Sequence, residues 1–292
     1  MRYAYYPGCS AKVTCPELHH STIKVAEKLG IELIELDSAS CCGAGVINEA
    51  NPDLNLALNA RNLALAEQQE LYTVLTICCT CQHTLADANK RLKNNAILLS
   101  KINNVLSKIG LKYNGKVAVK HFLWILIEEF GLEKLRKYVV TPLNGLKIAP
   151  FYGCHLLRPK EVLGFDDPEK PTSLDQLIEL FGGKPVEYNG KTKCCGFHLI
   201  LAKQKTALKM AGKNLQNAKE MGAECMVTPC PLCHMALDIY QQKIEGVMRA
   251  KINLPVLHLP QLVGLAMGLS MHEIKLSTHI VSAEKLFHKI GK

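Results

Sequence analysis

Cysteines are the residues of this sequence whose type and spacing could do chemistry. Ten of the 13 cysteines fall into two copies of one pattern, in which a lone cysteine precedes a Cys-Cys-Gly triplet and a C-x-x-C pair follows. The pattern is C-x(31)-C-C-x(35)-C-x-x-C in the first copy and C-x(39)-C-C-x(34)-C-x-x-C in the second. The first set is Cys9, Cys41, Cys42, Cys78 and Cys81, and the second set is Cys154, Cys194, Cys195, Cys230 and Cys233. Chance rarely repeats such a pattern, so these sets are predicted to form the site.

Three kinds of chemistry fit clustered cysteines. Structural zinc takes four ligands in a tetrahedron, whereas each set offers five cysteines, two of them adjacent. Adjacent cysteines can hold neighbouring irons of a multinuclear cluster, although a conventional [4Fe–4S] cluster would leave one of the five spare. A thioredoxin-like dithiol needs only the C-x-x-C pair. The spacing favours iron–sulfur clusters, while zinc in at least one set and dithiol chemistry stay open.

Three cysteines, Cys15, Cys79 and Cys225, lie outside the pattern. Cys79 stands inside the first C-x-x-C and could compete as a ligand, but the second copy has Pro231 at that position. We expect all three to be structural.

Alternating β-type runs and helical patterns surround both sets, so the elements that position the cysteines occur twice. Strands are expected at 2–6, 31–36, 72–77, 146–152, 185–188 and 223–227. Helices are expected at 17–29, 54–71, 82–92, 173–181, 203–221 and 232–244. Such alternation predicts an α/β fold with mostly parallel sheets, whose ligands gather beyond the carboxyl ends of the strands. Cys9, Cys78, Cys154 and Cys230 fall at or just beyond those ends.

The repeated order predicts two duplicated Rossmann-like domains, 1–143 and 144–292, because proline and glycine interrupt the helical pattern at 141–145. We expect an approximate two-fold axis to relate them. Such packing can bring the two cysteine sets face to face. The space between them would then be a substrate pocket with cationic side chains at its mouth and little water inside.

Composition describes a globular protein, with 48% hydrophobic and 21% charged residues. The longest apolar run, Phe122–Ile127, is far too short for a membrane span, and the N-terminus lacks a signal peptide. We therefore expect a cytoplasmic location, where cysteines favour metal or redox chemistry over disulfides. The net charge of +9 is spread along the chain without a dense basic block, which argues against nucleic-acid binding and suits solvated faces or an anionic substrate.

The sequence resembles the CCG-domain family through Gly8-Cys9, the first Cys-Cys-Gly triplet and its C-x-x-C pair, all repeated from Gly153-Cys154 onward. Within that family it is most similar to the B subunit of heterodisulfide reductase, a protein of methanogenesis. Related CCG domains occur in glycolate and lactate oxidation iron–sulfur subunits, in thiol:fumarate reductase and in some succinate dehydrogenases. Many of these relatives carry a ferredoxin-like segment that is absent here, so electrons are expected from another subunit.

The resemblance implies two non-cubane [4Fe–4S] clusters, one on each set of five cysteines, that reduce the coenzyme M–coenzyme B mixed disulfide to two thiols. It implies a complex with two further heterodisulfide reductase subunits, one bearing a flavin (A) and one bearing [4Fe–4S] clusters (C), with a hydrogenase as a further candidate partner. Two alternatives stay open. The first set could bind zinc, or the chain could be an electron-transfer subunit of a 2-hydroxy acid or succinate dehydrogenase, with no substrate between its clusters.

Four polar residues follow the cysteines of the second set and are candidates for contacts with the anionic groups of the substrate or for proton donation. They are His155, Arg158, Lys160 and His198. The competing interpretation is that Arg158 and Lys160 are solvated and that His155 is a turn residue hydrogen-bonded to the backbone. His121 and His258, at matching points of apolar helices, are expected to be buried packing residues.

Overall fold

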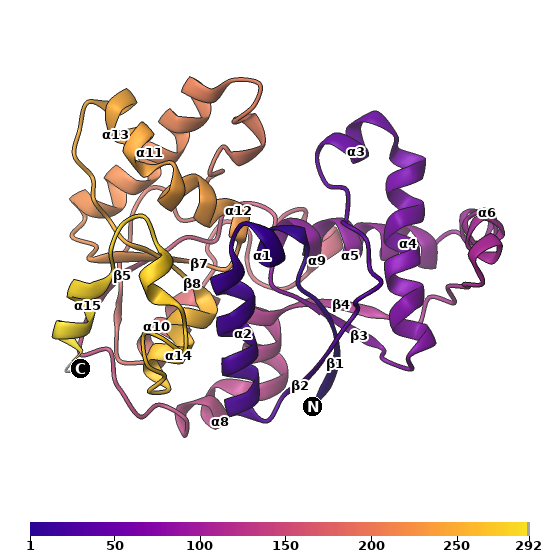
Figure 1. The fold of residues 1–292 in the computed structure, drawn as a ribbon, viewed down its shortest axis with the longest axis horizontal. Helices are drawn as coiled ribbons and strands as arrows, with labels where there is room; N and C mark the ends of the chain where they lie inside the picture. Colours follow the sequence, from indigo (N-terminus) through magenta and orange to yellow (C-terminus); the bar gives the residue numbers. More distant parts are fainter. Residues whose placement is uncertain (291–292) are drawn as a thin grey trace.

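The computed structural model describes residues 1–290, without the side chains of residues 287–289, and contains two parallel sheets of four strands (Figure 1). The first sheet has the order β2-β1-β3-β4 and the second the order β6-β5-β7-β8. The strands are β1 (Arg2–Tyr6), β2 (Glu32–Glu35), β3 (Thr73–Thr76), β4 (Ala118–His121), β5 (Lys147–Pro150), β6 (Lys184–Pro185), β7 (Cys225–Thr228) and β8 (Val256–His258). Each strand of the first sheet has the same position in the strand order as its counterpart in the second sheet. The predicted duplicated α/β fold is therefore confirmed.

Helices connect the strands in both halves of the chain. Those of the first half are α1 (Cys9–Val13), α2 (Pro16–Leu29), α3 (Val46–Ala50), α4 (Pro52–Gln68), α5 (Cys79–Lys93), α6 (Ala96–Leu106), η1 (Ser107–Ile109), α7 (Phe122–Trp124), η2 (Ile125–Gly131) and α8 (Leu132–Arg136). Those of the second half are α9 (Lys160–Leu163), α10 (Ser173–Leu180), η3 (Phe197–Leu199), α11 (Gln204–Glu220), α12 (Pro231–His234), η4 (Met235–Ile239), α13 (Gln241–Met248), α14 (Leu259–Ala266), η5 (Leu276–Thr278) and α15 (Glu284–Lys289).

Local sequence signals set the ends of the main helices. Proline occupies the first position of α2, and Gly30 ends that helix in the left-handed conformation that glycine adopts at low cost. Asn51 begins α4 by accepting a hydrogen bond from the backbone N–H of Leu54. These signals explain why the expected helices at 17–29 and 54–71 lie within two or three residues of the observed ones.

Two expectations about the second half were wrong in detail. The strand expected at 185–188 is β6 (Lys184–Pro185), an edge strand whose pairing with β5 ends with the bond from the backbone N–H of Val186 to the carbonyl of Ile148. The helix expected at 232–244 is divided into α12, a π-helical segment η4 and α13. Within η4, Asp238 is buried and accepts hydrogen bonds from a distant backbone segment.

His121 and His258 lie at the ends of β4 and β8 rather than inside helices, so their expected placement was also wrong. Each histidine ends a strand in extended backbone and precedes the first turn of the following helix. Both side chains are buried, as expected.

The two halves share an extensive interface. Helix α2 of the first half packs against α14 of the second, and α1 contacts α12 near the middle of the molecule (Figure 1). The backbone N–H groups of Val140 and Thr141 donate to the carbonyl of Ala266 across it. The division at 143/144 falls between β4 and β5, and both this boundary and the two-fold relation stay predictions. Within the described residues, no helix has the length and apolarity that crossing a membrane requires.

Candidate metal centre and substrate cavity

The cysteine sets lie at the carboxyl ends of their sheets, as predicted. Cys9 follows β1 and begins α1, and Cys78 follows β3 and precedes α5. In the second half, Cys154 follows β5, and Cys230 follows β7 and precedes α12. The Cys-Cys-Gly triplets lie in loops that approach these strand ends. Each set is therefore gathered by the fold from three separate segments.

The first set brings its sulfur atoms into contact in pairs. The Sγ atoms of Cys9 and Cys41 are 3.5 Å apart, and those of Cys42 and Cys81 are also 3.5 Å apart. A hydrogen bond joins the thiols of Cys78 and Cys81. Cys9 and Cys41 are exposed, whereas the other three are buried.

The second set repeats this arrangement. The side chains of Cys154 and Cys194, of Cys195 and Cys233, and of Cys230 and Cys233 lie close enough to shift the pKa values of their thiols. Here too the first two cysteines are the more exposed pair. The matching pattern indicates that both sets present the same five-sulfur environment.

The two sets approach each other where the halves meet, since the side chains of Cys78 and Cys230 lie close enough for each to shift the pKa of the other. Cys79, outside the pattern, also lies close to Cys230 and lowers its pKa. The ten sulfurs thus form one continuous series, in the order Cys9, Cys41, Cys42, Cys81, Cys78, Cys230, Cys233, Cys195, Cys194 and Cys154. This series brings together all ten cysteines of the sequence pattern.

Glycines leave open space beside the sulfur atoms of both sets. This space is one criterion for whether the residues fit an iron–sulfur group. A Cβ at Gly8 would lie 3.0 Å from Cys81 Sγ, and a Cβ at Gly153 would lie 3.1 Å from Cys233 Sγ. Both glycines have positive φ, +78° and +68°. The same cradle in both halves, with five thiols in each, fits iron–sulfur ligation, which cysteine thiolates provide.

Hydrogen bonds from amides position the triplets. Asn55 and Asn59 on α4 donate their side-chain amides to the carbonyl of Cys42, at 2.8 and 2.9 Å. In the second half, Asn214 on α11 donates to the carbonyl of Cys194 at 3.1 Å. The sequence reasoning missed these asparagines, although repeated Asn on one face of an otherwise apolar helix is a signal that could have found them.

Neighbouring thiols change the acidity of the triplet cysteines. Hydrogen bonds from Cys41 and Cys81 lower the pKa of Cys42 to about 4. Hydrogen bonds from Cys154 and Cys195 lower the pKa of Cys194 to about 2. One sulfur in each triplet is thereby stabilised as a thiolate, the form that binds metal.

A cavity of about 400 Å³ opens beside the first set and is walled on its far side by the second half. Besides the cysteines, its lining is mostly apolar, and Glu49 is its charged residue among those described. A second cavity, of about 20 Å³, lies beside the second set. Both cavities are lined by Thr80, Phe197, His198 and Leu232. These shared residues make the two cavities neighbours across a thin wall.

Of the four residues predicted to contact substrate, His155 and His198 lie at these cavities and the other two do not. Arg158 donates to the carbonyls of Thr192 and Pro168 and pairs with Glu169 at 2.9 Å. Lys160 is exposed at the start of α9. Arg158 is held by these partners, and the described lining of the two cavities contains no lysine or arginine, so the cationic mouth stays a prediction.

The two cavity histidines belong to a row of three imidazoles that crosses the interface. His155 stacks on His83 of α5 with ring centroids 4.8 Å apart, and its centroid lies 5.9 Å from that of His198. Burial and the neighbouring His83 lower the pKa of His155. His83 was not predicted, because only the packing of the halves brings it to the second set.

Comparison with known proteins places this geometry in a family. The CCG cysteine-rich domain matches residues 3–86 and 148–238, the two segments that carry the cysteine sets. The chain belongs to the CCG cysteine-rich domain family. The predicted resemblance is therefore confirmed, and the chain is a member of a cysteine-rich iron–sulfur oxidoreductase family that includes heterodisulfide reductase homologues.

Two relatives match nearly the whole chain. The 8-methylmenaquinol:fumarate reductase membrane anchor subunit of Wolinella succinogenes is 41% identical over 284 residues, covering 97% of this chain and 98% of that protein. The B subunit of a ferredoxin/F420H2-dependent CoB–CoM heterodisulfide reductase from Methanosarcina acetivorans is 34% identical over 292 residues, covering 99% and 97%.

A solved structure supports the fold. A hypothetical protein from Helicobacter pylori is similar over 97% of this chain, with a TM-score of 0.77 and 18% sequence identity. The chain spans about half of that structure, 52% of its length. At this identity the likeness concerns the fold alone.

Proposed function

We propose that the chain is the redox subunit of a multi-subunit oxidoreductase, in which each cysteine set holds one non-cubane [4Fe–4S] cluster and both sets face one substrate site. The observation that carries this proposal is the proximity of the two cysteine sets, which line neighbouring cavities and whose members Cys78 and Cys230 lie close enough to shift each other's pKa. The neighbouring cavities, with four lining residues in common, supply the space for a substrate.

The expected chemistry is a two-electron reaction, since each cluster would supply or accept electrons one at a time. The chain's own residues would do the remaining work. Phe197 and Leu232 exclude water from the wall between the sets, and His155 and His198 stand where a proton could be held for the substrate.

Heterodisulfide reduction is the first candidate reaction, supported by the relative named as the B subunit of such an enzyme. Two electrons and two protons convert one S–S bond into two thiols, and sulfur sets on opposite sides suit the two halves of that bond. Partners would be the flavin-bearing and [4Fe–4S]-bearing subunits of that enzyme (A and C), together with a hydrogenase. A cytoplasmic location remains part of this proposal.

Exchange of electrons with a quinol is the second candidate, and the cavity lining favours it. The coenzyme M–coenzyme B disulfide carries sulfonate, phosphate and carboxylate groups, for which the described lining offers no lysine or arginine. Its walls instead include Val46, Ile200, Leu201 and Tyr240, which suit an apolar ring or chain. The relative named as a subunit of a methylmenaquinol:fumarate reductase gives the same indication. On these grounds the quinol is the better supported substrate.

One pair of assays decides between them. The complex, purified anaerobically with its native partners, is given reduced viologen dye with the heterodisulfide, and separately a menaquinol analogue with fumarate. Turnover of the quinol alone, weakened by Leu201→Lys, supports the second candidate, and turnover of the disulfide alone supports the first. Failure of both substrates in a complex with full iron content would refute a substrate site between the sets.

A further inference from the structure

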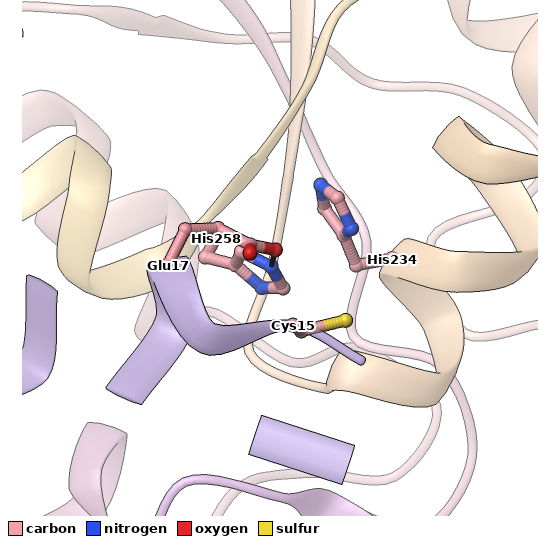
Figure 2. Close-up of side chains that lie close together, drawn as sticks. All are labelled: Cys15, Glu17, His234 and His258. Atoms are coloured by element: carbon pink, nitrogen blue, oxygen red, sulfur yellow. Dashed lines mark hydrogen bonds and ion pairs between the residues drawn. The ribbon is translucent and has the colours of Figure 1, made fainter. Parts of the chain in front are cut away.

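A cluster of four metal-ligating side chains includes none of the ten cysteines of the pattern (Figure 2). Cys15 and Glu17 come from the start of α2 in the first half, and His234 of α12 and His258 at the end of β8 come from the second. Their ligand atoms all lie within 4.8 Å of one another, and all four residues are buried. A thiol, a carboxyl and two imidazoles therefore converge on one small volume of the interface.

The hydrogen bonds of His234 leave one of its ring nitrogens free. Its Nε2 lies 2.9 Å from the carbonyl oxygen of Val256, which can only accept, so Nε2 carries the proton. Nδ1 is then a lone-pair acceptor, and among the described residues it has no hydrogen-bond partner. A buried acceptor without a donor costs about 1–3 kcal/mol. A cation bound at Nδ1 would remove that cost.

The duplicated half indicates that this histidine is not needed to hold the fold together. Gln82, which follows Cys81 as His234 follows Cys233, donates its Nε2 amide to the carbonyl of Val119 at 2.9 Å. Val119 lies two residues before the end of β4, as Val256 lies two residues before the end of β8. A glutamine therefore makes the same bond to the neighbouring strand, and what the histidine adds is the second nitrogen.

We propose that Cys15, Glu17, His234 and His258 bind one zinc ion that links the two halves of the chain. A mixed set of one thiolate, one carboxylate and two imidazoles suits zinc in tetrahedral coordination. The two anionic ligands balance the double charge of the ion, which leaves a neutral centre in a buried interface. No cysteine of the two sets takes part, so the site is separate from the iron–sulfur ligands.

The four groups need limited movement to bind the ion. Ligand atoms around tetrahedral zinc are about 3.4 Å apart, given Zn–N distances near 2.1 Å. The observed spread of up to 4.8 Å must contract, and the stacked rings of His234 and His258, with centroids 3.8 Å apart, must tilt away from each other. Glu17 and His258 already meet, with Oε1 and Nε2 3.0 Å apart.

A second layer of hydrogen bonds would orient the ligands. His279 lies with Nδ1 2.8 Å from His234 Nε2, and its own Nε2 is 2.9 Å from Gln261 Oε1. Such outer hydrogen bonds fix the tautomer and the direction of metal-binding histidines. His279 follows η5 near the C-terminus and Gln261 lies on α14, so the ion would couple both segments to the interface.

The test is metal analysis of the anaerobically purified chain, with His234→Gln as the variant. Gln82 is the precedent for this change, so the variant should keep the bond to Val256 and fold. We expect about one zinc per wild-type chain, and at least a tenfold loss in the variant with iron unchanged. Glu17→Gln is a second variant with the same expectation. His121→Gln, which changes the matching interface histidine of the first half, should retain the zinc.

Zinc X-ray absorption separates this site from zinc bound by a cysteine set. One sulfur with nitrogen and oxygen neighbours near 2.0–2.1 Å supports the proposal, whereas four sulfurs near 2.3 Å overturn it. Absence of zinc from protein expressed in zinc-supplemented medium also overturns it, as does full zinc retention in both variants. None of these readouts depends on which substrate the chain acts on.

Discussion

Alanine at Gly153 should remove the metal group of the second set while leaving the fold intact. The built Cβ lies 3.1 Å from Cys233 Sγ, and ordinary contacts begin at 3.4 Å, so the sulfur must move by at least about 0.3 Å. Metal–ligand distances in well-formed sites lie within about 0.2 Å of their standard values, so a shift of this size disfavours binding. Loss of one of two [4Fe–4S] clusters would lower iron from about eight to about four atoms per chain.

Gly30 is a matched control for this substitution. Its φ of +67° is nearly that of Gly153, +68°, but nothing lies within 4 Å of the position its Cβ would take. Alanine in the left-handed conformation costs about 1–2 kcal/mol, so both variants should lose that much unfolding free energy. Iron and acid-labile sulfide assays with denaturant titrations measure both effects. Full iron content in Gly153→Ala, at the stability of Gly30→Ala, would refute the idea that glycine makes room for a metal group.

Asn59→Ala removes the amide bonds to the carbonyls of Cys42 and Asn55, so the unfolding free energy should fall by about 1–3 kcal/mol in a denaturant titration. An unchanged value would show that the amide does not hold the triplet. Burial lowers the pKa of His121 from 6.5 to about 4, so stability is complete above about pH 6.5 and decreases as the pH falls toward 4. His121→Gln should flatten that part of the stability profile, and a profile identical to wild type would contradict this assignment. Cys42→Ala and Cys195→Ala should abolish turnover to similar extents, because both sets border one space, and near-normal turnover of either variant would contradict a shared site.

Much of the fold could be predicted because strand and helix periods are local properties. Strands at 2–6 and 72–77 were expected from short β-type runs, and β1 and β3 lie within them. The helix expected at 232–244 is instead divided at η4, where Asp238 accepts hydrogen bonds from Ile280 and Val281, more than 40 residues away. Local patterns cannot report such contacts.

The candidate site was likewise predictable only in part from the sequence. Spacing identified ten cysteines, but the contact of Cys78 with Cys230 depends on how the halves pack. Proximity in sequence to Cys154 made Arg158 a candidate for substrate binding, yet its guanidinium is turned to the carbonyls of Thr192 and Pro168. Sequence gives the residue type near a site, whereas the direction of a long side chain is decided by acceptors elsewhere in the chain.

The interface between the halves and the site are one region of this protein. His121 of the first half donates from Nε2 to the carbonyl of Pro229, next to Cys230, because its Nδ1 already accepts from the backbone of Leu123. On the other side, Glu17 reaches His258 over 241 positions of sequence. Polar and sulfur atoms thus connect the two halves close to the metal-binding residues. We therefore expect a change that loosens their packing to alter the distance between the cysteine sets, so that interface stability and the proposed redox function vary together.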